Sequence, residues 1–494
     1  MAVPFLGRLK GLEWPILMFS LLLVVVESVL SFITLLLPSP VIGLFDKLAH
    51  ELFSLVPESS KLTDDPKLDK LVKEVSDAPG FVELCKIFGY QAEEHIVKTS
   101  DGFLLGIHRI GGPKGSSWRS YTRQNRPVVY MHHGLLMNSE VFVTNVDPKK
   151  SIAFALADLG YDVWLGNNRG NKYSKKHLHK EPGDKEFWDF SMDDFALYDI
   201  PDTIDYILKY VHQKDLCYIG FSQGSAQGFA ALSINPQLNS KIRLFIALAP
   251  AMAPPGLRNR IVDTLMKATP SLIYLFFGKR SILQSAGFWQ SIMYPPVFIK
   301  VIDYAIDFLF NWKSRNIWYP QKLASYAHLY SYTSVKSVVH WFQIMRSGRF
   351  HMFDDDVQSP LMYDPRTYRV APFPTQNIMS PVVLIYGTSD SLVDINVMLA
   401  ELPEGTAHVG VPKYEHLEII WGDNVDKLVF PYVQSALNRV VGTPNEKTLT
   451  TTHRLLPPAD KARISEAIEE TETYEDALDF EIEEITRRKS LYFT

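Results

Sequence analysis

The chain has 494 residues, 46% of them hydrophobic and 12% aromatic, which is enough for a large core in one domain or two. Its net charge of −5 gives no reason to expect a nucleic-acid partner. Two cysteines exclude a disulfide framework, and no asparagine begins an Asn-x-Ser/Thr sequon, so the composition favours a reducing compartment over the secretory lumen.

The first elements along the chain predict a hydrophobic membrane anchor over residues 1–45. Residues 15–37 are almost uninterruptedly apolar. About 22 residues of helix would extend about 33 Å, the thickness of a hydrocarbon core. Glu27 near the centre would cost a simple spanning helix about 2–3 kcal/mol.

The anchor is expected to be either a spanning helix or a hairpin that dips into the membrane and returns. Pro38 and Pro40 interrupt the apolar run, which then resumes. Arg8 and Lys10 place the N-terminus in the cytosol. A spanning helix would put the rest of the chain on the other side, whereas a hairpin would keep the catalytic domain cytosolic. The missing sequons and disulfides favour the hairpin.

After a charged segment, the chain alternates between strand and helix patterns. Residues 89–110 predict two alternating strands around a Ser-Asp-Gly turn, and residues 127–136 and 161–170 each predict a buried strand. Helical periodicity lies between the strands, as at residues 193–211. This alternation predicts an α/β fold with a mostly parallel sheet, whose active site lies at the carboxyl ends of the strands.

An apolar, aromatic run that begins at Leu216 predicts a short buried strand. It leads into Gly220-Phe221-Ser222-Gln223-Gly224, and a helix of small residues is expected to follow up to Asn235-Pro236. A serine on a tight turn between strand and helix is the nucleophile elbow of an α/β-hydrolase. Gly-x-Ser-x-Gly alone is a weak signal, because an ordinary strand-to-helix turn can carry it by chance. The flanking elements and the partners in the expected order favour the elbow.

Strand patterns disappear from about residue 251 to 379, and aromatic-rich helices are expected there. Phe298, Ile302, Ile306 and Leu309 recur at helical spacing. Such a stripe most often packs on a core, but it could also offer an apolar surface to lipid, and different faces of one helix could do both. We interpret this region as a helical cap over the active site.

Residues 381–387 return to a strand pattern and complete the organisation of the chain. Residues from 443 onward are polar and acidic, which is typical of a solvated tail with at most one helix. The predicted divisions are an anchor at 1–45, a charged linker at 46–78, the first part of an α/β-hydrolase core at 79–250, a helical cap or lid at 251–379, the second part of the core at 380–441 and an acidic, disordered tail at 442–494.

The candidate catalytic residues follow the chain order Ser, Asp, His of this fold. Ser222 would be the nucleophile and His416, in the last loop before the terminal helix, its base. Asp390, three residues past the end of the 381–387 strand, would orient the histidine. Asp394 is the second choice for the carboxylate.

Two backbone N–H groups are needed to bind the oxyanion of the tetrahedral intermediate. Gln223, the residue after the nucleophile, should supply one, and Leu135, in the loop after His133 and Gly134, the other. His133 itself is expected to be structural. No metal-ligand spacing and no cofactor motif is evident, so we expect neither.

Several stretches together resemble the acid lipase family, which comprises the gastric and lysosomal acid lipases and their fungal relatives. They occur in the family's order between residues 78 and 432, and the match is therefore specific. The stretches include Gly89-Tyr90, His133-Gly134-Leu135-Leu136, Gly166-Asn167-Asn168-Arg169-Gly170, Phe187-Trp188-Asp189-Phe190-Ser191, Gly220 to Gly224, His340-Trp341, Asp390 and His416.

The resemblance implies the same roles for Ser222, His416, Asp390, Leu135 and Gln223, and a cap that uncovers an acyl pocket at a lipid surface. The secreted relatives have a cleaved signal, sequons and a cap disulfide, and this chain shows none of these. Its opening residues 4–9 and the apolar block after them look like the membrane-anchored sterol ester hydrolases of yeasts.

The sequence therefore predicts an enzyme that hydrolyses sterol esters to sterol and fatty acid at a lipid-droplet or endoplasmic-reticulum membrane surface. A triacylglycerol lipase with the same machinery is the nearest alternative. A non-catalytic lipid-binding relative and an acyltransferase are further alternatives, and the complete set of Ser222, Asp390 and His416 argues against the first of these. The expected partners are a neutral lipid ester and the lipid surface, with no protein partner inferred.

Overall fold

The computed structural model describes residues 63–115, 126–259, 273–274, 277–286, 293–355 and 370–441, together with positions 22, 25, 29, 263 and 290. Apart from the three isolated positions, the predicted membrane anchor lies outside the described residues, as does the predicted acidic tail. None of the helices within the described ranges is long and apolar enough to cross a membrane.

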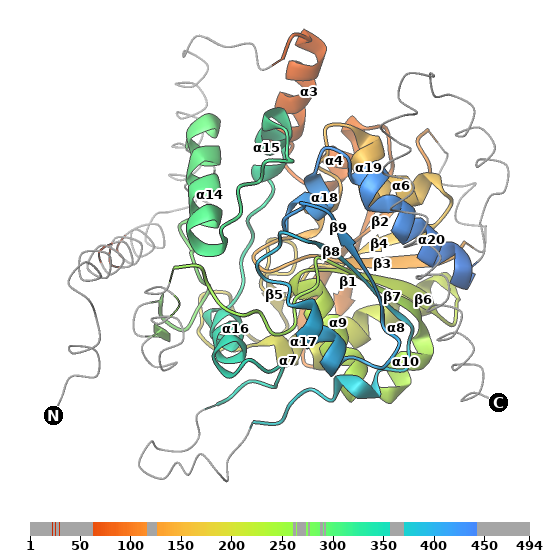
Figure 1. Ribbon diagram of the computed structural model, residues 1–494, viewed down its shortest axis with the longest axis vertical. Helices are drawn as coiled ribbons and strands as arrows, with labels where there is room; N and C mark the ends of the chain where they lie inside the picture. The colour runs from red at the N-terminus through yellow and green to blue at the C-terminus, as the bar shows by residue number, and fades with distance from the viewer. Residues whose placement is uncertain are drawn as a thin grey trace.

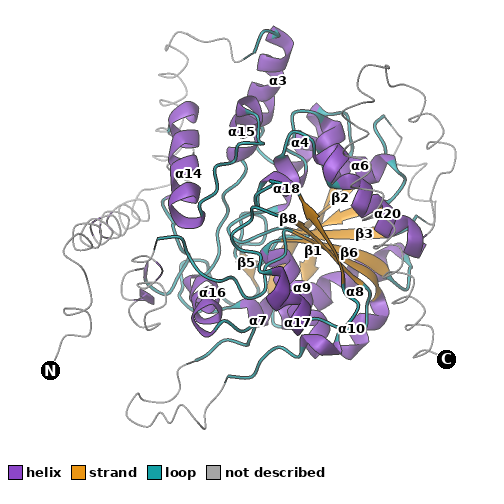
Figure 2. Cartoon of the chain, viewed as in Figure 1, coloured by secondary structure: helices purple, strands orange, loops and turns teal. Residues whose placement is uncertain are grey.

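A nine-stranded sheet forms the centre of the fold (Figure 2). Its main path runs β1-β2-β4-β3-β6-β7-β8-β9, and β5 pairs with β2. From β4 to β9 neighbouring strands are parallel, whereas β1, β2 and β5 pair antiparallel. The strands are β1 (Ala92–Lys98), β2 (Phe103–Ile110), β3 (Val128–His132), β4 (Asp162–Leu165), β5 (Lys176–His177), β6 (Leu216–Phe221), β7 (Ile242–Leu248), β8 (Val382–Gly387) and β9 (Ala407–Val411).

The mostly parallel sheet of the predicted α/β-hydrolase fold is thus confirmed. The antiparallel pair β1–β2 turns at residues 99–102, as the Ser-Asp-Gly turn predicted. Three strands, β5, β7 and β9, were not predicted from the sequence. β7 is almost continuously apolar and directly follows a helix, so it has no alternation that would mark a strand.

Helices cover both faces of the sheet (Figure 1). They are α3 (Pro66–Ser76), α4 (Phe81–Ile87), α6 (Ile152–Asp158), α7 (Met192–Asp194), α8 (Ile200–Val211), α9 (Gln223–Ile234), α10 (Pro236–Lys241), α14 (Pro295–Phe310), α15 (Tyr319–Tyr326), α16 (Val335–Ser347), α17 (Ile395–Glu401), α18 (Glu418–Trp421), α19 (Val425–Leu428) and α20 (Phe430–Val441). Short 3₁₀ turns lie at η1 (Ser139–Phe142), η2 (Pro148–Lys150) and η4 (Thr375–Asn377), and η3 (Phe195–Asp199) is a π-turn.

Side-chain alternation along the central strands divides the core into two layers. In β6, Ile219 and Phe221 pack into the layer that holds α6 and α20, whereas Leu216 and Tyr218 pack into the layer that holds α8 and α9. The period of two in a strand sends neighbouring side chains to opposite faces. Because both faces are covered by helices, the strand is buried along its whole length.

The helix predicted at residues 193–211 contains a short π-helix between α7 and α8. Pro201 lies in the first turn of α8 and has no N–H to donate to the carbonyl four residues earlier. The chain accommodates this missing hydrogen bond in η3.

The segment predicted as a charged linker at 46–78 is helical where it is described. Asp65 caps α3 through a hydrogen bond from the N–H of Lys67, and Val72 and Val75 are buried. The helix packs against α15, which lies in the segment predicted as the cap. Charged residues dominate its exposed face, and its small apolar face packs inward.

Between β7 and β8, the described residues contain helices and two isolated β-bridges but no strand of the sheet. In α14, Phe298, Ile302 and Ile306 pack against the core. The helix starts at Pro295 and ends at Phe310, and Asn311 after it adopts the left-handed conformation of a C-terminal cap. Figure 1 places α14, α15 and α16 to one side of the sheet.

Candidate active site

Ser222 lies on a strained turn between β6 and α9. Its φ of 54° is a conformation that side-chain-bearing residues rarely adopt. The flanking glycines make the turn possible. A Cβ on Gly220 would lie 2.6 Å from backbone atoms of Gly224, and a Cβ on Gly224 would lie 2.3 Å from the carbonyl oxygen of His132. The turn therefore has the geometry of a nucleophile elbow.

Asp390 and His416 meet at the carboxyl end of the sheet. Asp390 follows β8 and His416 follows β9, and the His416 Nδ1–H donates to Asp390 Oδ2 over 2.6 Å. The other carboxylate oxygen of Asp390 accepts the N–H of Leu392. Both catalytic candidates are buried. This carboxylate can therefore fix the orientation of the imidazole and leave Nε2 as its free base.

Asp394, the second choice for this role, caps α17 instead. Its side chain accepts the N–H of Val397. The structure places Asp390, and not Asp394, against His416.

The imidazole of His416 lies between two aromatic rings. Trp312 stacks on it with ring centres 4.8 Å apart, and the ring of Phe221, the neighbour of Ser222, lies 5.3 Å away. Ser222 and His416 are both among the described residues, and no hydrogen bond joins Ser222 Oγ to the imidazole of His416. Such bonds are often long in a substrate-free site and tighten when substrate binds.

The loop after β3 approaches the elbow from the side. A Cβ on Gly134 would lie 3.1 Å from the Cβ of Ser222, so this loop runs directly past the nucleophile. Leu135 follows in the same loop, and Gln223 is the first residue of α9. The N–H groups in the first turn of a helix have no partner within it and carry a partial positive charge. Both candidate oxyanion donors are therefore adjacent to Ser222.

His133 has a structural role, as the sequence suggested. Its Nδ1–H donates to the carbonyl of Gly134, and its Nε2 accepts the N–H of Asn168. Burial lowers the pKa of His133 to about 4, so the ring is neutral at pH 7. The histidine braces the loop that carries Leu135.

A buried charge cluster further along the same loop was not predicted from the sequence. Glu140 is fully buried and accepts hydrogen bonds from Lys172, Tyr173 and His328. Burial alone would raise the pKa of Glu140, but the bonds from His328 and Lys172 outweigh it and lower the pKa to about 2. His328 also bonds the carbonyl of Val75 in α3. These partners are far apart in the chain, so no local pattern could indicate them.

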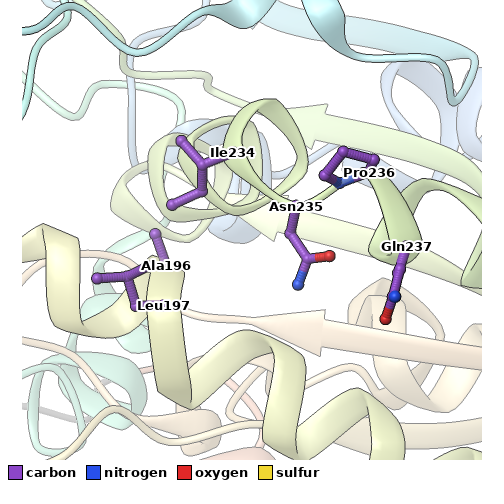
Figure 3. A pocket seen from close by; sticks show the side chains of 6 residues that line it. All are labelled: Ala196, Leu197, Ile234, Asn235, Pro236 and Gln237. Carbon is purple, nitrogen blue, oxygen red and sulfur yellow. The ribbon is translucent and has the colours of Figure 1, made fainter.

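A surface hollow of 440 Å³ lies away from these residues, at the C-terminal end of α9 (Figure 3). Twelve residues of helix separate this end from Ser222, a distance of about 18 Å. The hollow offers no titratable group, and we assign it no role in catalysis. It is lined by Ala196, Leu197, Ile234, Asn235, Pro236 and Gln237. Within the described ranges, no three histidine, cysteine or acidic side chains gather in a way that could hold a metal ion.

Two family models match the chain. Residues 81–146 match the partial alpha/beta-hydrolase lipase region, and residues 127–423 match the alpha/beta hydrolase fold. A protein of Schizosaccharomyces pombe named a probable lipase is 50% identical over 451 residues, which cover 90% of this chain and 95% of the relative. Human gastric triacylglycerol lipase is 35% identical over 369 residues, which cover 72% and 90%. The chain belongs to the acid lipase family of α/β-hydrolases.

A further relative of this acid lipase occurs in Crotalus adamanteus, and its name assigns it to the lysosomal acid lipases/cholesteryl ester hydrolases. It is 34% identical over 368 residues, 72% of this chain and 90% of the relative. The predicted family resemblance is thus confirmed. Membership of a lipase family identifies the class of reaction as carboxylic ester hydrolysis and the class of substrate as a lipid ester.

Proposed function

We propose that this acid lipase hydrolyses sterol esters to free sterol and fatty acid through an acyl-enzyme on Ser222. The observation that carries the proposal is the 2.6 Å hydrogen bond between Asp390 and His416 at the same edge of the sheet as the Ser222 elbow. Serine becomes a nucleophile only when a base takes its proton, and a buried carboxylate that orients the imidazole provides that base.

In the proposed reaction, Ser222 Oγ attacks the ester carbonyl and its proton moves to Nε2 of His416. The N–H groups of Leu135 and Gln223 bind the resulting oxyanion. The intermediate collapses, the proton passes from His416 to the sterol oxygen, and the sterol leaves. Water then attacks the acyl-enzyme with His416 as base and releases the fatty acid, while Asp390 keeps the imidazole in one orientation in both steps.

The proposal places this chemistry at a lipid surface, and the outer face of α14 supports it. Opposite the core-facing stripe, Tyr294, Val297, Val301, Tyr304 and Phe308 are exposed at helical spacing, and Tyr304 is 80% exposed. An apolar stripe of this kind, with tyrosines among its members, suits the boundary between headgroups and acyl chains.

We further propose that the chain is anchored to a lipid-droplet or endoplasmic-reticulum membrane by residues 1–45, with its catalytic domain in the cytosol. The apolar run at 15–37 and its resemblance to membrane-anchored sterol ester hydrolases support the anchor. The exposed face of α14 would then meet the same surface from the catalytic domain.

Triacylglycerol hydrolysis is the second candidate. The named gastric lipase from human acts on triacylglycerol, and its identity to this chain is as high as that of the relative named for cholesteryl ester hydrolysis. The acyl chemistry is the same for both substrates, and the acid lipase machinery does not distinguish them.

Detergent-solubilised full-length protein tests the assignment with cholesteryl oleate and triolein in parallel mixed micelles. The proposal expects a higher kcat/KM for the sterol ester. Faster turnover of triolein would move the function to the second candidate and keep the mechanism. A sterol acceptor added in excess would reveal an acyltransferase by the appearance of new ester in place of fatty acid.

A further inference from the structure

The side chain of the residue next to the nucleophile is held by the cap region. The indole N–H of Trp341, in α16, donates to the Oε1 atom of Gln223 over 2.7 Å. The two residues are 118 positions apart in the chain, and both are at least 95% buried. In a buried environment a hydrogen bond between neutral groups is strong, and it leaves a costly unpaired atom when it is broken.

This bond acts on the peptide that carries an oxyanion donor. Gln223 is the first residue of α9, and the strained elbow at Ser222 determines the direction of the Gln223 backbone N–H. The Gln223 side chain is the first one after the nucleophile, and it can anchor this peptide to another part of the protein. The Trp341 bond fixes the Gln223 amide, with its oxygen directed at α16.

The same helix also braces the loop that carries the other donor. Leu135 packs against the apolar cluster to which Val338 and Val339 of α16 belong. Just before α16, the N–H of Ser331 donates to the carbonyl of Leu136 over 2.6 Å. One helix of the cap region therefore contacts both segments that would bind the oxyanion.

We propose that Trp341 is a positioning residue of the acid lipase, which acts through Gln223 to hold the oxyanion donors at the distance the transition state requires. The inference rests on the proposed function, because it assigns Trp341 a part in stabilising the oxyanion formed at Ser222. Donors that are held rigidly before the reaction cost no reorganisation when charge develops. A loosened donor weakens transition-state binding more than substrate binding.

The test uses Trp341→Phe and a soluble p-nitrophenyl ester, so that docking to lipid does not enter the rate. We expect kcat to fall roughly tenfold to a hundredfold with KM within about twofold, less than the loss of a whole oxyanion donor. A trifluoromethyl ketone places an oxyanion at the same position, and its affinity should fall by the same factor as kcat/KM.

Trp188→Phe is the matched control, because Trp188 is also buried and its indole N–H also donates to a carbonyl, that of Pro182. Its melting temperature should fall, while kcat stays at the wild-type value. An equal loss of kcat in both variants, or a Trp341→Phe variant with wild-type kcat, would overturn the positioning role. If the wild type itself releases no product, the proposed function fails instead.

The partner of the bond supplies a second variant if Trp341→Phe does not fold. Gln223→Met removes the acceptor and keeps the backbone N–H and the side-chain size. We expect the same loss in kcat from Gln223→Met as from Trp341→Phe, and no further loss when the two are combined. Losses that multiply in the double variant would contradict action through this hydrogen bond.

Discussion

The indole of Trp312 lies parallel to the imidazole of His416, with ring centres 4.8 Å apart and an angle of 4° between the planes. Phe310 also stacks on Trp312, with ring centres 4.4 Å apart. The indole N–H of Trp312 is buried, and no described residue accepts it. The stacking surface, rather than a hydrogen bond, is therefore what this tryptophan supplies to the site.

Replacing Trp312 should lower activity by freeing the imidazole to tilt. We expect Trp312→Leu to reduce kcat on a soluble ester about tenfold, because a base that leaves its productive orientation loses rate steeply. Trp312→Phe keeps an aromatic face and should recover most of the loss. Equal kcat for the Leu and Phe variants, measured under steady-state conditions, would show that stacking does not matter.

Glu140→Gln should destabilise the protein by about 3 kcal/mol, because Lys172 and His328 would lose a buried carboxylate partner. Denaturant unfolding at pH 7 measures this, with Glu186→Gln at the surface as a control expected to change stability by less than about 0.5 kcal/mol.

The effect of Glu140 should also depend on pH. Its folded pKa of about 2 lies below the ordinary 4.5, so its contribution is present above about pH 4.5 and is lost as the pH falls toward 2. The stability gap between wild type and Glu140→Gln should therefore narrow over this range. A stability difference that stays constant between about pH 4.5 and pH 2 would contradict the lowered pKa of Glu140.

Asp193 should show the opposite dependence. Burial raises its pKa from 3.8 to about 6, although the N–H of Phe353 donates to the carboxylate and Lys336 lies nearby. The folded state then holds a proton more tightly than the unfolded one, and stability falls as the pH rises from about 4 to about 6.

Asp193→Asn removes this titration and keeps an acceptor for Phe353. The substitution should change the free energy of unfolding more favourably at pH 7.5 than at pH 4. The difference between its effects at the two pH values should reach about 3 kcal/mol. Thermal unfolding at both pH values provides the comparison. A variant whose effect is the same at both would contradict the raised pKa.

The elbow should not tolerate a methyl group at Gly224. A Cβ there would lie 2.3 Å from the carbonyl oxygen of His132 and 2.8 Å from that of His133, and backbone atoms cannot move aside as a flexible side chain can. Gly224→Ala is expected to cost about 2–3 kcal/mol and to abolish activity. Gly183→Ala is the control, since a Cβ at Gly183 meets no atom within 4 Å.

Charge on the outer face of α14 should separate lipid binding from chemistry. Val301→Glu combined with Tyr304→Glu puts two carboxylates on the exposed stripe. We expect lower activity on an emulsified ester and weaker binding to phospholipid vesicles, with unchanged kcat on a soluble ester. Equal activity of the double variant and the wild type on emulsions would show that this face of α14 does not take part in lipid binding.

The sequence predicted those features that local pattern determines. Gly-x-Ser-x-Gly between a strand and a helix located the elbow, and chain order identified Asp390 and His416 as partners. The paired strands β1 and β2 were also expected, because a turn motif separates two alternating runs. The signals for the elbow and for the β1–β2 pair lie within a few residues of the chain.

Contacts between distant segments could not be predicted. Trp312 contacts His416, Trp341 contacts Gln223 and Glu140 contacts His328. Each pair is separated by more than a hundred residues of chain, and only the fold brings the two partners together. Likewise, β7 lacks alternation because both of its faces are buried.

The most direct test of the central claim compares the wild type with Ser222→Ala in detergent, with cholesteryl oleate as substrate and released fatty acid as the measured product. The account predicts steady release by the wild type and a loss of at least about a thousandfold in the variant, with its melting temperature preserved. Release by Ser222→Ala at the wild-type rate would contradict Ser222 as the nucleophile and, with it, the proposed mechanism.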